Sequence, residues 1–244
     1  MQTHFTVVDL ETTGLDPKKD KIIEIGAIQV NNGKITGTFH ALVNPGRKLS
    51  DKVKELTGIT DEELQKASPI EEVIKDFLQF ADKECLLGHH ILFDYSFLKR
   101  AAVNSGLTFE REGIDTLKIA RIFLQDLESR SLPALCRHFQ IEHAPHRALD
   151  DVKATFALYE KFLELFFEKN SGPFKPSKLI YQVKKEGPVT KKQLEQIHKI
   201  LLYHHLTDQY QSTESADYMD FTKMTKNEAS RFIDQMILRH GRCR

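Results

Sequence analysis

The sequence predicts an α/β fold, in which a mixed sheet is flanked by helices, followed by a small and mostly helical C-terminal module. Three strand-like apolar segments come first, strand and helix signals then alternate, and only helix signals follow residue 178. Alternating strands and helices are typical of a sheet covered by helices. The expected units are an α/β domain over residues 1–169, a linker over 170–178 and a helical module over 179–244.

Five strands are expected in the sheet. FTVVDL (5–10) is a short apolar run of the kind found in buried strands. IIEIGAIQV (22–30) and ITGTFHALV (35–43) flank the turn-forming residues 31–34, which predicts an antiparallel hairpin. The remaining two strands are predicted at ECLLGH (84–89) and near Ile114.

Helix signals account for the rest of the first domain. Ser68-Pro69-Ile70-Glu71 combines a capping serine, a first-turn proline and a reciprocal glutamate ahead of an amphipathic run to Phe80. Further helices are predicted from about Phe93, after Ile114, and over about 148–167, where apolar residues recur every three to four positions.

The C-terminal module is predicted to contain two helices and to bind a partner. NSGPFKPSK (170–178) has two prolines and a glycine among polar residues, as linkers do. Capping boxes at Thr190–Gln193 and Thr225–Glu228 begin the two helices. From residue 173 onward there are 13 basic and 8 acidic residues. One hypothesis is docking onto a polymerase or helicase, and the other is a nucleic-acid grip formed by Lys184, Lys185, Lys191 and Lys192.

Composition excludes several protein classes. The chain has 244 residues, with 35 basic and 35 acidic ones, and no apolar run approaches the ~20 residues of a spanning helix. The three cysteines are far apart and odd in number, which is against a disulfide framework. The N-terminus shows no export signal. We therefore expect a cytoplasmic protein that has no contact with a membrane.

Two acids stand at the end of the first predicted strand. Asp9 and Glu11 are two residues apart, so both carboxylates project to the same face. Adjacent acids repel each other unless a cation lies between them, and Mg²⁺ and Mn²⁺ prefer oxygen ligands. An Asp-x-Glu pair alone is nevertheless more often two solvated acids in a turn.

Two later segments carry further candidates. In GHHILFDYSFL, Asp94 follows a predicted strand and lies in the first turn of a helix, where an acid is also favoured by the helix dipole. In HRALDDVKATF, His146 precedes a helix whose opening turns carry Asp150 and Asp151. Histidine suits a general base, because its ordinary pKa of about 6.5 lets it accept a proton near neutral pH. Spacing alone does not choose between the two aspartates.

Together, VVDLETTGLDP, GHHILFDYSFL and HRALDDVKAT resemble the three motifs of the DnaQ-like exonuclease family, in its DEDDh branch. The resemblance covers about residues 4–167, and LTGIT (56–60) and IDTL (114–117) are similar to further landmarks of the family. It implies a ribonuclease-H-like fold and a 3′→5′ exonuclease. The sequence departs from the family at His90, where asparagine is usual, and at Val152, where alanine is usual.

The resemblance also implies roles for individual residues. His146 would be the general base, and two divalent cations, Mg²⁺ or Mn²⁺, would be held by Asp9, Glu11, Asp94 and Asp151, which leaves Asp150 as a neighbour. The substrate would be DNA, as a single strand or a frayed 3′ end. The terminal nucleotide would contact Thr12, Thr13, Gly14, Ile59, His90 and Phe93, although Ile59 and Phe93 are equally typical of a core.

Three other functions compete with this one. An RNA exonuclease of the same family has the same motifs, because the choice between DNA and RNA depends on contacts with the 2′-OH. A catalytically inactive nucleic-acid binding module would lack a ligand or the base, and none is missing. A structural zinc site fails on spacing and leaves the acids unexplained; its ligands would be Cys136, His138, His143 and His146.

Overall fold

The computed structural model describes residues 3–243 and confirms a mixed α/β fold. One six-stranded sheet has the order β3-β2-β1-β4-β5-β6. β1 pairs antiparallel with β2 and parallel with β4, β2 pairs antiparallel with β3, β5 is parallel to β4, and β6 is antiparallel to β5. The strands are β1 (His4–Thr12), β2 (Ile22–Asn31), β3 (Lys34–Leu42), β4 (Cys85–Gly88), β5 (Glu112–Asp115) and β6 (Ser177–Lys178).

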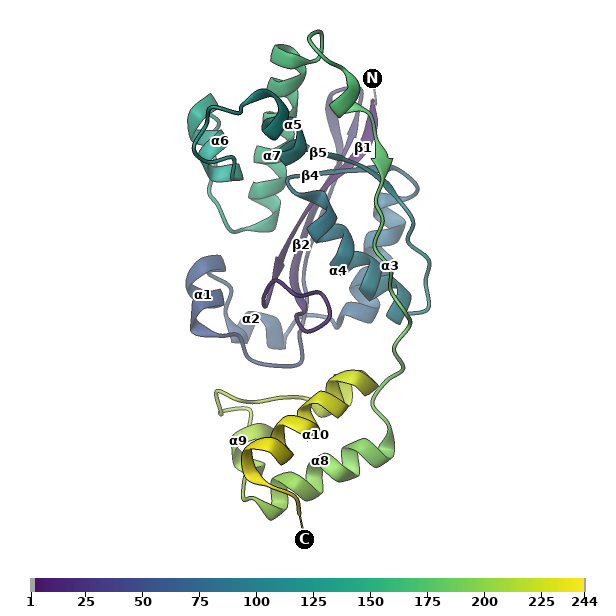
Figure 1. Ribbon diagram of the computed structural model, residues 1–244, viewed down its shortest axis with the longest axis vertical. Helices are drawn as coiled ribbons and strands as arrows, with labels where there is room; N and C mark the ends of the chain where they lie inside the picture. Colours follow the sequence, from purple (N-terminus) through teal and green to yellow (C-terminus); the bar gives the residue numbers. More distant parts are fainter. Residues whose placement is uncertain (1–2, 244) are drawn as a thin grey trace.

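Helices cover both faces of the sheet (Figure 1). Those of the first domain are α1 (Asp51–Thr57), α2 (Asp61–Gln65), α3 (Ile70–Ala81), α4 (Ile91–Asn104), α5 (Thr116–Phe123), α6 (Leu132–Phe139) and α7 (Ala148–Phe166). They are followed by the 3-10 helix η1 (Gly172–Phe174), then α8 (Lys191–Tyr203), α9 (Thr207–Gln211), η2 (Phe221–Lys223) and α10 (Lys226–His240).

Strand alternation divides the core into two clusters. On β1, Phe5 and Val7 pack in one cluster with residues of α5, α6 and α7, whereas Val8 and Leu10 pack in another with residues of α3 and α4. Successive side chains of a strand point to opposite faces, which produces this division. Asp9 and Glu11 have the same parity as Val7, so they face α7.

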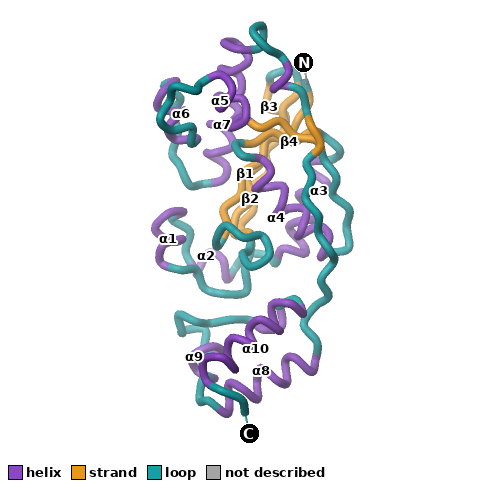
Figure 2. The backbone as a smooth tube through the Cα atoms, viewed as in Figure 1, coloured by secondary structure: helices purple, strands orange, loops and turns teal. Residues whose placement is uncertain are grey.

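The C-terminal helices enclose a core of their own. Residues of α8, α9 and α10 form a third cluster that includes Ile197, Tyr210 and Phe232. Figure 2 shows this helical unit at the end of the molecule away from α5, α6 and α7. Polar contacts hold it against the first domain, including an ion pair of Lys21 with Glu228 (2.6 Å) and a hydrogen bond from Arg231 to the Lys18 carbonyl (3.0 Å).

Several elements differ from the sequence-based expectation. The sheet has a sixth strand, the two-residue β6, which lies within the predicted linker and pairs with the edge of β5. Four short α-helices, α1, α2, α6 and α9, and the two 3-10 helices η1 and η2 were not predicted. Within residues 3–243, we find no helix whose length and apolar character would let it cross a membrane. The division at 169 and 178 stays a proposal, and its outermost residues 1, 2 and 244 lie outside the described residues.

Candidate active site

Three of the predicted metal ligands converge where β1 ends. Asp9 and Glu11 come from β1, and Asp151 comes from the first turns of α7. One carboxylate oxygen of each lies within 4.8 Å of those of the other two. They form the one group of three or more histidine, cysteine or acidic side chains at metal-binding separation among the residues that the structure describes. The zinc ligand set that was rejected on spacing is accordingly not assembled among these residues.

Asp94 lies beside this acid cluster of Asp9, Glu11 and Asp151 but outside its 4.8 Å limit. Its side chain is buried in the first turn of α4, and its Oδ1 accepts a hydrogen bond from the Leu10 backbone N–H (3.2 Å). Leu10 stands between Asp9 and Glu11, so this bond fixes α4 to the strand segment that carries the acids.

The acid cluster is electrostatically unfavourable without a cation. Burial raises the pKa of Asp9 well above its usual range, and the charges of Asp94, Asp151 and Glu11 raise it further. Burial, followed by the charges of Asp151 and Glu24, raises the pKa of Glu11 to about 8. Burial also raises the pKa of Asp94. Carboxylates that resist ionisation in this way fit a divalent cation, which would compensate their charges.

Gly26 allows α7 to approach the strand that carries the acids. It pairs with Asp9 across β1 and β2, and a Cβ built on it would lie 2.5 Å from the Ala148 carbonyl carbon. Any side chain at this position would therefore push the start of α7 away from the sheet. Asp151 lies one turn into the same helix, so the close approach helps to bring its carboxylate to Asp9.

Glu24 fixes the same helix start and was not singled out from the sequence. Its side chain is fully buried, with 0% exposure. It accepts hydrogen bonds from the Ala148 backbone N–H (3.0 Å) and the Arg147 guanidinium (3.1 and 3.2 Å), and it pairs with His40 (2.7 Å). An acid inside the apolar run IIEIG was the signal that could have identified it, because buried charges need partners.

His146 directly precedes α7 in a strained backbone conformation. Its φ is +72°, which is uncommon for a residue with a side chain, and its backbone N–H donates to Oδ2 of Asp151 (2.9 Å). The other carboxylate oxygen of Asp151 pairs with Nε2 of His143. The structure therefore places two histidines at Asp151, although the sequence nominated only His146 as base.

Three of the six predicted nucleotide contacts, Thr12, Thr13 and Gly14, lie at the end of β1 and directly after it. Thr12 donates to the Gly14 carbonyl (2.7 Å), and the Thr13 hydroxyl bonds to Arg47 and Asp20. The absence of a side chain at Gly14 leaves space for the Asp20 carboxylate. A Cβ at position 14 would lie 2.5 Å from its Oδ2.

The other three predicted contacts differ in exposure. Ile59 is 1% exposed in an apolar cluster with Ile23, Leu49 and Leu64, so its direct contact with a nucleotide would require rearrangement. His90 is exposed, and its backbone φ is +72°. Its ring lies roughly parallel to that of Phe93, with 6.4 Å between the ring centroids. All six assignments stay predictions.

Comparisons with known proteins identify exonucleases and DNA polymerases as relatives of this chain. Residues 6–159 match the family model described as Exonuclease. The DNA polymerase III subunit epsilon of Aquifex aeolicus is 36% identical over 70% of this chain and 86% of its own length. The PolC-type DNA polymerase III of Caldanaerobacter subterraneus subsp. tengcongensis is 42% identical over 67% of this chain, which spans only 12% of that relative.

A solved structure supports the same comparison. Exonuclease X in complex with 5′ overhanging duplex DNA superposes with a TM-score of 0.53 and 28% identity, over 66% of this chain and 92% of that one.

Proposed function

This chain belongs to the family of DnaQ-like 3′→5′ exonucleases, and we propose that it hydrolyses DNA from the 3′ end with the help of divalent cations. The family membership confirms the resemblance identified from the three sequence motifs. The convergence of Asp9, Glu11 and Asp151 within 4.8 Å is the observation that carries the metal-dependent mechanism. DNA is the proposed substrate because relatives are DNA polymerase subunits and a similar exonuclease binds duplex DNA.

The acids fit Mg²⁺ or Mn²⁺, and two ions are proposed. All candidate ligands are oxygen atoms, as these cations prefer, and no hydrogen-bond donor within residues 3–243 reaches the carboxylates of Asp9 or Glu11. Asp9, Glu11, Asp94 and Asp151 would hold them. When bound, such ions supply charge stabilisation for the attacking and leaving oxygens of a phosphodiester. The product would be a nucleoside 5′-monophosphate.

His146 is proposed to take the proton from the attacking water. It lies at the start of α7, one turn before Asp151, and its backbone hydrogen bond to that carboxylate keeps the two residues together. His143 is held differently, because its Nε2 is already paired with Asp151. We therefore assign the base to His146 and an orienting contact to His143.

The central experiment measures release of mononucleotides from 3′-labelled and 5′-labelled DNA, with matched RNA strands, in Mg²⁺ or Mn²⁺. The 3′ label should be released first and only with metal, and Asp9→Ala should abolish release. Release that starts at the 5′ end, or that persists in a chelator, would refute the proposal. Faster digestion of RNA than of matched DNA would instead support the alternative RNA exonuclease.

Histidine variants test the base. His146→Ala should lower kcat by about 10²–10⁴-fold with little change in KM, because it removes proton transfer. His198→Ala, an exposed histidine of α8, is the control and should behave as the parent. If His143→Ala lost more activity than His146→Ala, the roles of the two histidines would be reversed.

A polymerase or helicase partner stays a prediction. Its support is that the similar segment forms 12% of a PolC-type polymerase. Co-elution of this chain with a replicative polymerase on gel filtration would test it. Elution of the two proteins at unchanged positions would argue against the partnership.

A further inference from the structure

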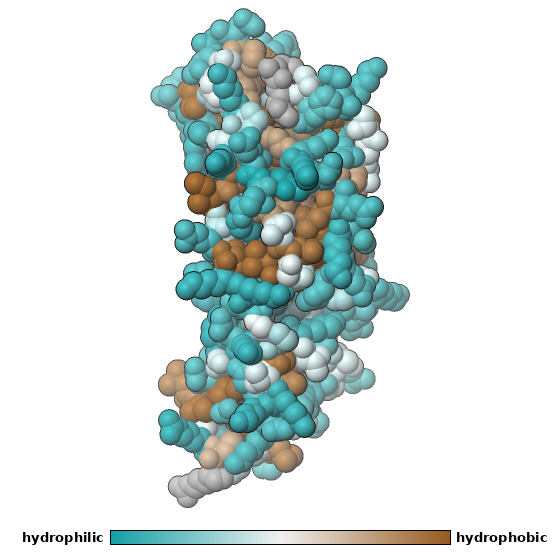
Figure 3. Space-filling view, turned by 90° about the vertical axis from the view of Figure 1, so that its right-hand side faces the viewer, coloured by the Kyte–Doolittle hydropathy of each residue, from teal (hydrophilic) through white to brown (hydrophobic). Residues whose placement is uncertain are grey.

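A large groove lies on the side of the molecule along which residues 176–187 descend (Figure 1). It has a volume of about 1830 Å³, and its walls come from the C-terminal half of α4, residues 82–85, residues 110–112, segment 176–187 and the start of α10. Figure 3 views the molecule from this side, which is mostly hydrophilic around apolar patches near its middle.

Internal ion pairs build the walls of this groove. Lys99 of α4 pairs with both carboxylate oxygens of Glu110 (2.7 and 2.8 Å). Arg100 of α4 pairs with Glu186 (2.9 Å), whose backbone N–H donates to Asn104 (3.1 Å). Segment 176–187 is therefore fixed to α4, and the charges of these residues are compensated within the protein.

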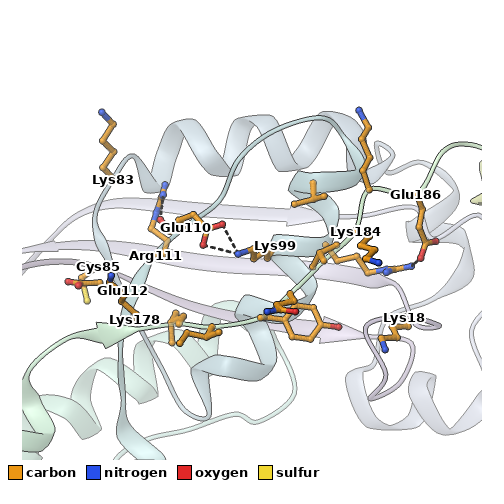
Figure 4. A pocket seen from close by; sticks show the side chains of 18 of the residues that line it. Lys18, Lys83, Cys85, Lys99, Glu110, Arg111, Glu112, Lys178, Lys184 and Glu186 are labelled. Atoms are coloured by element: carbon orange, nitrogen blue, oxygen red, sulfur yellow. Dashed lines mark hydrogen bonds and ion pairs between the residues drawn. The ribbon is translucent and has the colours of Figure 1, made fainter.

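Several lysines at one end of the groove have no ion-pair partner among the described residues. We call Lys18, Lys184, Lys185 and Lys226 the lysine set. No carboxylate within residues 3–243 forms an ion pair with any of them. Figure 4 shows Lys184 and Lys18 together at one side of the view, with Lys83 and Lys178 at the other. That other end also carries Asp82, Glu84 and Glu112, so positive charge is concentrated at the lysine set.

We propose that the lysine set binds the phosphodiester backbone of a nucleic acid strand outside the site of cleavage. Exposed lysines are suited to this ligand, since each phosphate that they neutralise releases counterions. Lys18 belongs to the loop that directly follows β1, the strand that carries Asp9 and Glu11. The hydrogen bond from Arg231 to the Lys18 carbonyl holds this loop against α10. The lysine set therefore extends from the loop that follows the acids to the C-terminal helices.

This inference deepens the proposed function and assigns part of the substrate footprint to the C-terminal unit. Of the four lysines predicted as a nucleic-acid grip, Lys184 and Lys185 line the groove, whereas Lys191 and Lys192 do not. Lys18 and Lys226 join them only through folding, because they lie far from 184–185 in the sequence.

The test compares two triple charge reversals. The groove variant is Lys18→Glu/Lys184→Glu/Lys226→Glu, and the control is Lys75→Glu/Lys161→Glu/Lys199→Glu, which changes net charge equally on α3, α7 and α8. Affinity for labelled single-stranded and duplex DNA and for RNA is measured by anisotropy in a chelator, across a salt series. Circular dichroism and thermal melting verify that both variants are folded.

The groove variant should bind nucleic acid at least about tenfold more weakly, and its slope of log K against log salt should fall by about 2–3. The control should keep most of the parental affinity and slope. In the groove variant, hydrolysis of a dinucleotide should fall less than hydrolysis of a long strand, because a short substrate has fewer phosphates for the lysine set to bind. Equal losses in both variants would overturn the proposal, as would competition by polyglutamate as strong as that by DNA. Absence of dinucleotide hydrolysis in the parent would contradict the proposed function alone.

Discussion

Two glutamates, Glu11 and Glu24, are paired across β1 and β2, and in the described part of the chain only Glu24 has hydrogen-bond donors around its carboxylate. Glu11 and Glu24 are register partners, so their side chains project to the same face of the sheet. Glu24 has hydrogen-bonding partners in Arg147, His40 and the Ala148 backbone. Glu11 accepts no hydrogen bond within residues 3–243, and burial with nearby negative charge raises its pKa to about 8.

The difference separates a structural acid from a ligand-binding one. A buried carboxylate stabilises a fold only when donors compensate its lost hydration, as they do at Glu24. Asp9 and Glu11 of the acid cluster lack such donors within residues 3–243, so they cost stability until a cation arrives. Poorly compensated acids are typical of functional sites. Removing charge should therefore have opposite effects on stability in the two regions.

Asp9→Asn should cause the largest change. Loss of a metal ligand should lower kcat by about 10³-fold or more, because bound cations supply several kcal/mol of charge stabilisation. The same substitution should raise the melting temperature of the metal-free protein by removing a repelled, buried charge. Asp150→Asn is the matched control, since that carboxylate is 45% exposed on α7 and pairs with Lys153. A metal-free Asp9→Asn protein less stable than the parent would contradict our interpretation of the cluster.

Stability of the metal-free protein should depend on pH. The pKa of Glu11 is raised from 4.5 to about 8, so the folded state binds a proton more tightly than the unfolded state. The resulting stabilisation is fully present below pH 4.5 and is lost as pH rises through 8, by on the order of 5 kcal/mol. Urea unfolding in a chelator at several pH values measures this loss.

Mn²⁺ should restore much of the stability that is lost at pH 8, because binding to the folded state alone favours it. Stability that rises between pH 4.5 and 8 without metal would show that other groups dominate. The same series on Asp9→Asn should show a smaller decrease, since the raised pKa of Asp9 itself no longer contributes.

Glu24→Gln should destabilise the protein, in contrast to Asp9→Asn. The amide can still accept from Ala148, but the charged hydrogen bonds with Arg147 weaken, at a cost of about 2–3 kcal/mol. Urea unfolding measures the change. Glu164→Gln, which removes an exposed pair with Lys161, should cost less than about 1 kcal/mol. If the two variants were equally stable, Glu24 would not be the anchor of α7.

The sequence predicts the acids of the candidate metal site, but it does not predict the contacts that stabilise Glu24. The side-chain period of β1 correctly placed Asp9 and Glu11 on one face, and helix signals placed Asp94 and Asp151 at the starts of α4 and α7. Local pattern sufficed there because strand ends and helix starts are defined by neighbouring residues.

Other features depend on contacts between distant segments. Glu24 meets Arg147 and Ala148 across more than 120 positions, and no local signal indicates that pairing. His143 reaches Asp151 from an irregular loop, and β6 is a strand only because β5 lies beside it. The capping box Thr60–Glu63 is a local signal that could have identified α2, although the helix is too short for periodicity to support it.

His40→Ala should give the smallest effect and sharpen the comparison. The imidazole is 39% exposed and provides one of several contacts to Glu24, so its loss should cost about 0.5–1 kcal/mol in urea unfolding. In the Glu24→Gln background the cost should be smaller, because the charge with which His40 interacts is absent. A double-mutant cycle measures this coupling. Full additivity would show that His40 merely lies near Glu24, and that Arg147 and the start of α7 stabilise the buried carboxylate without it.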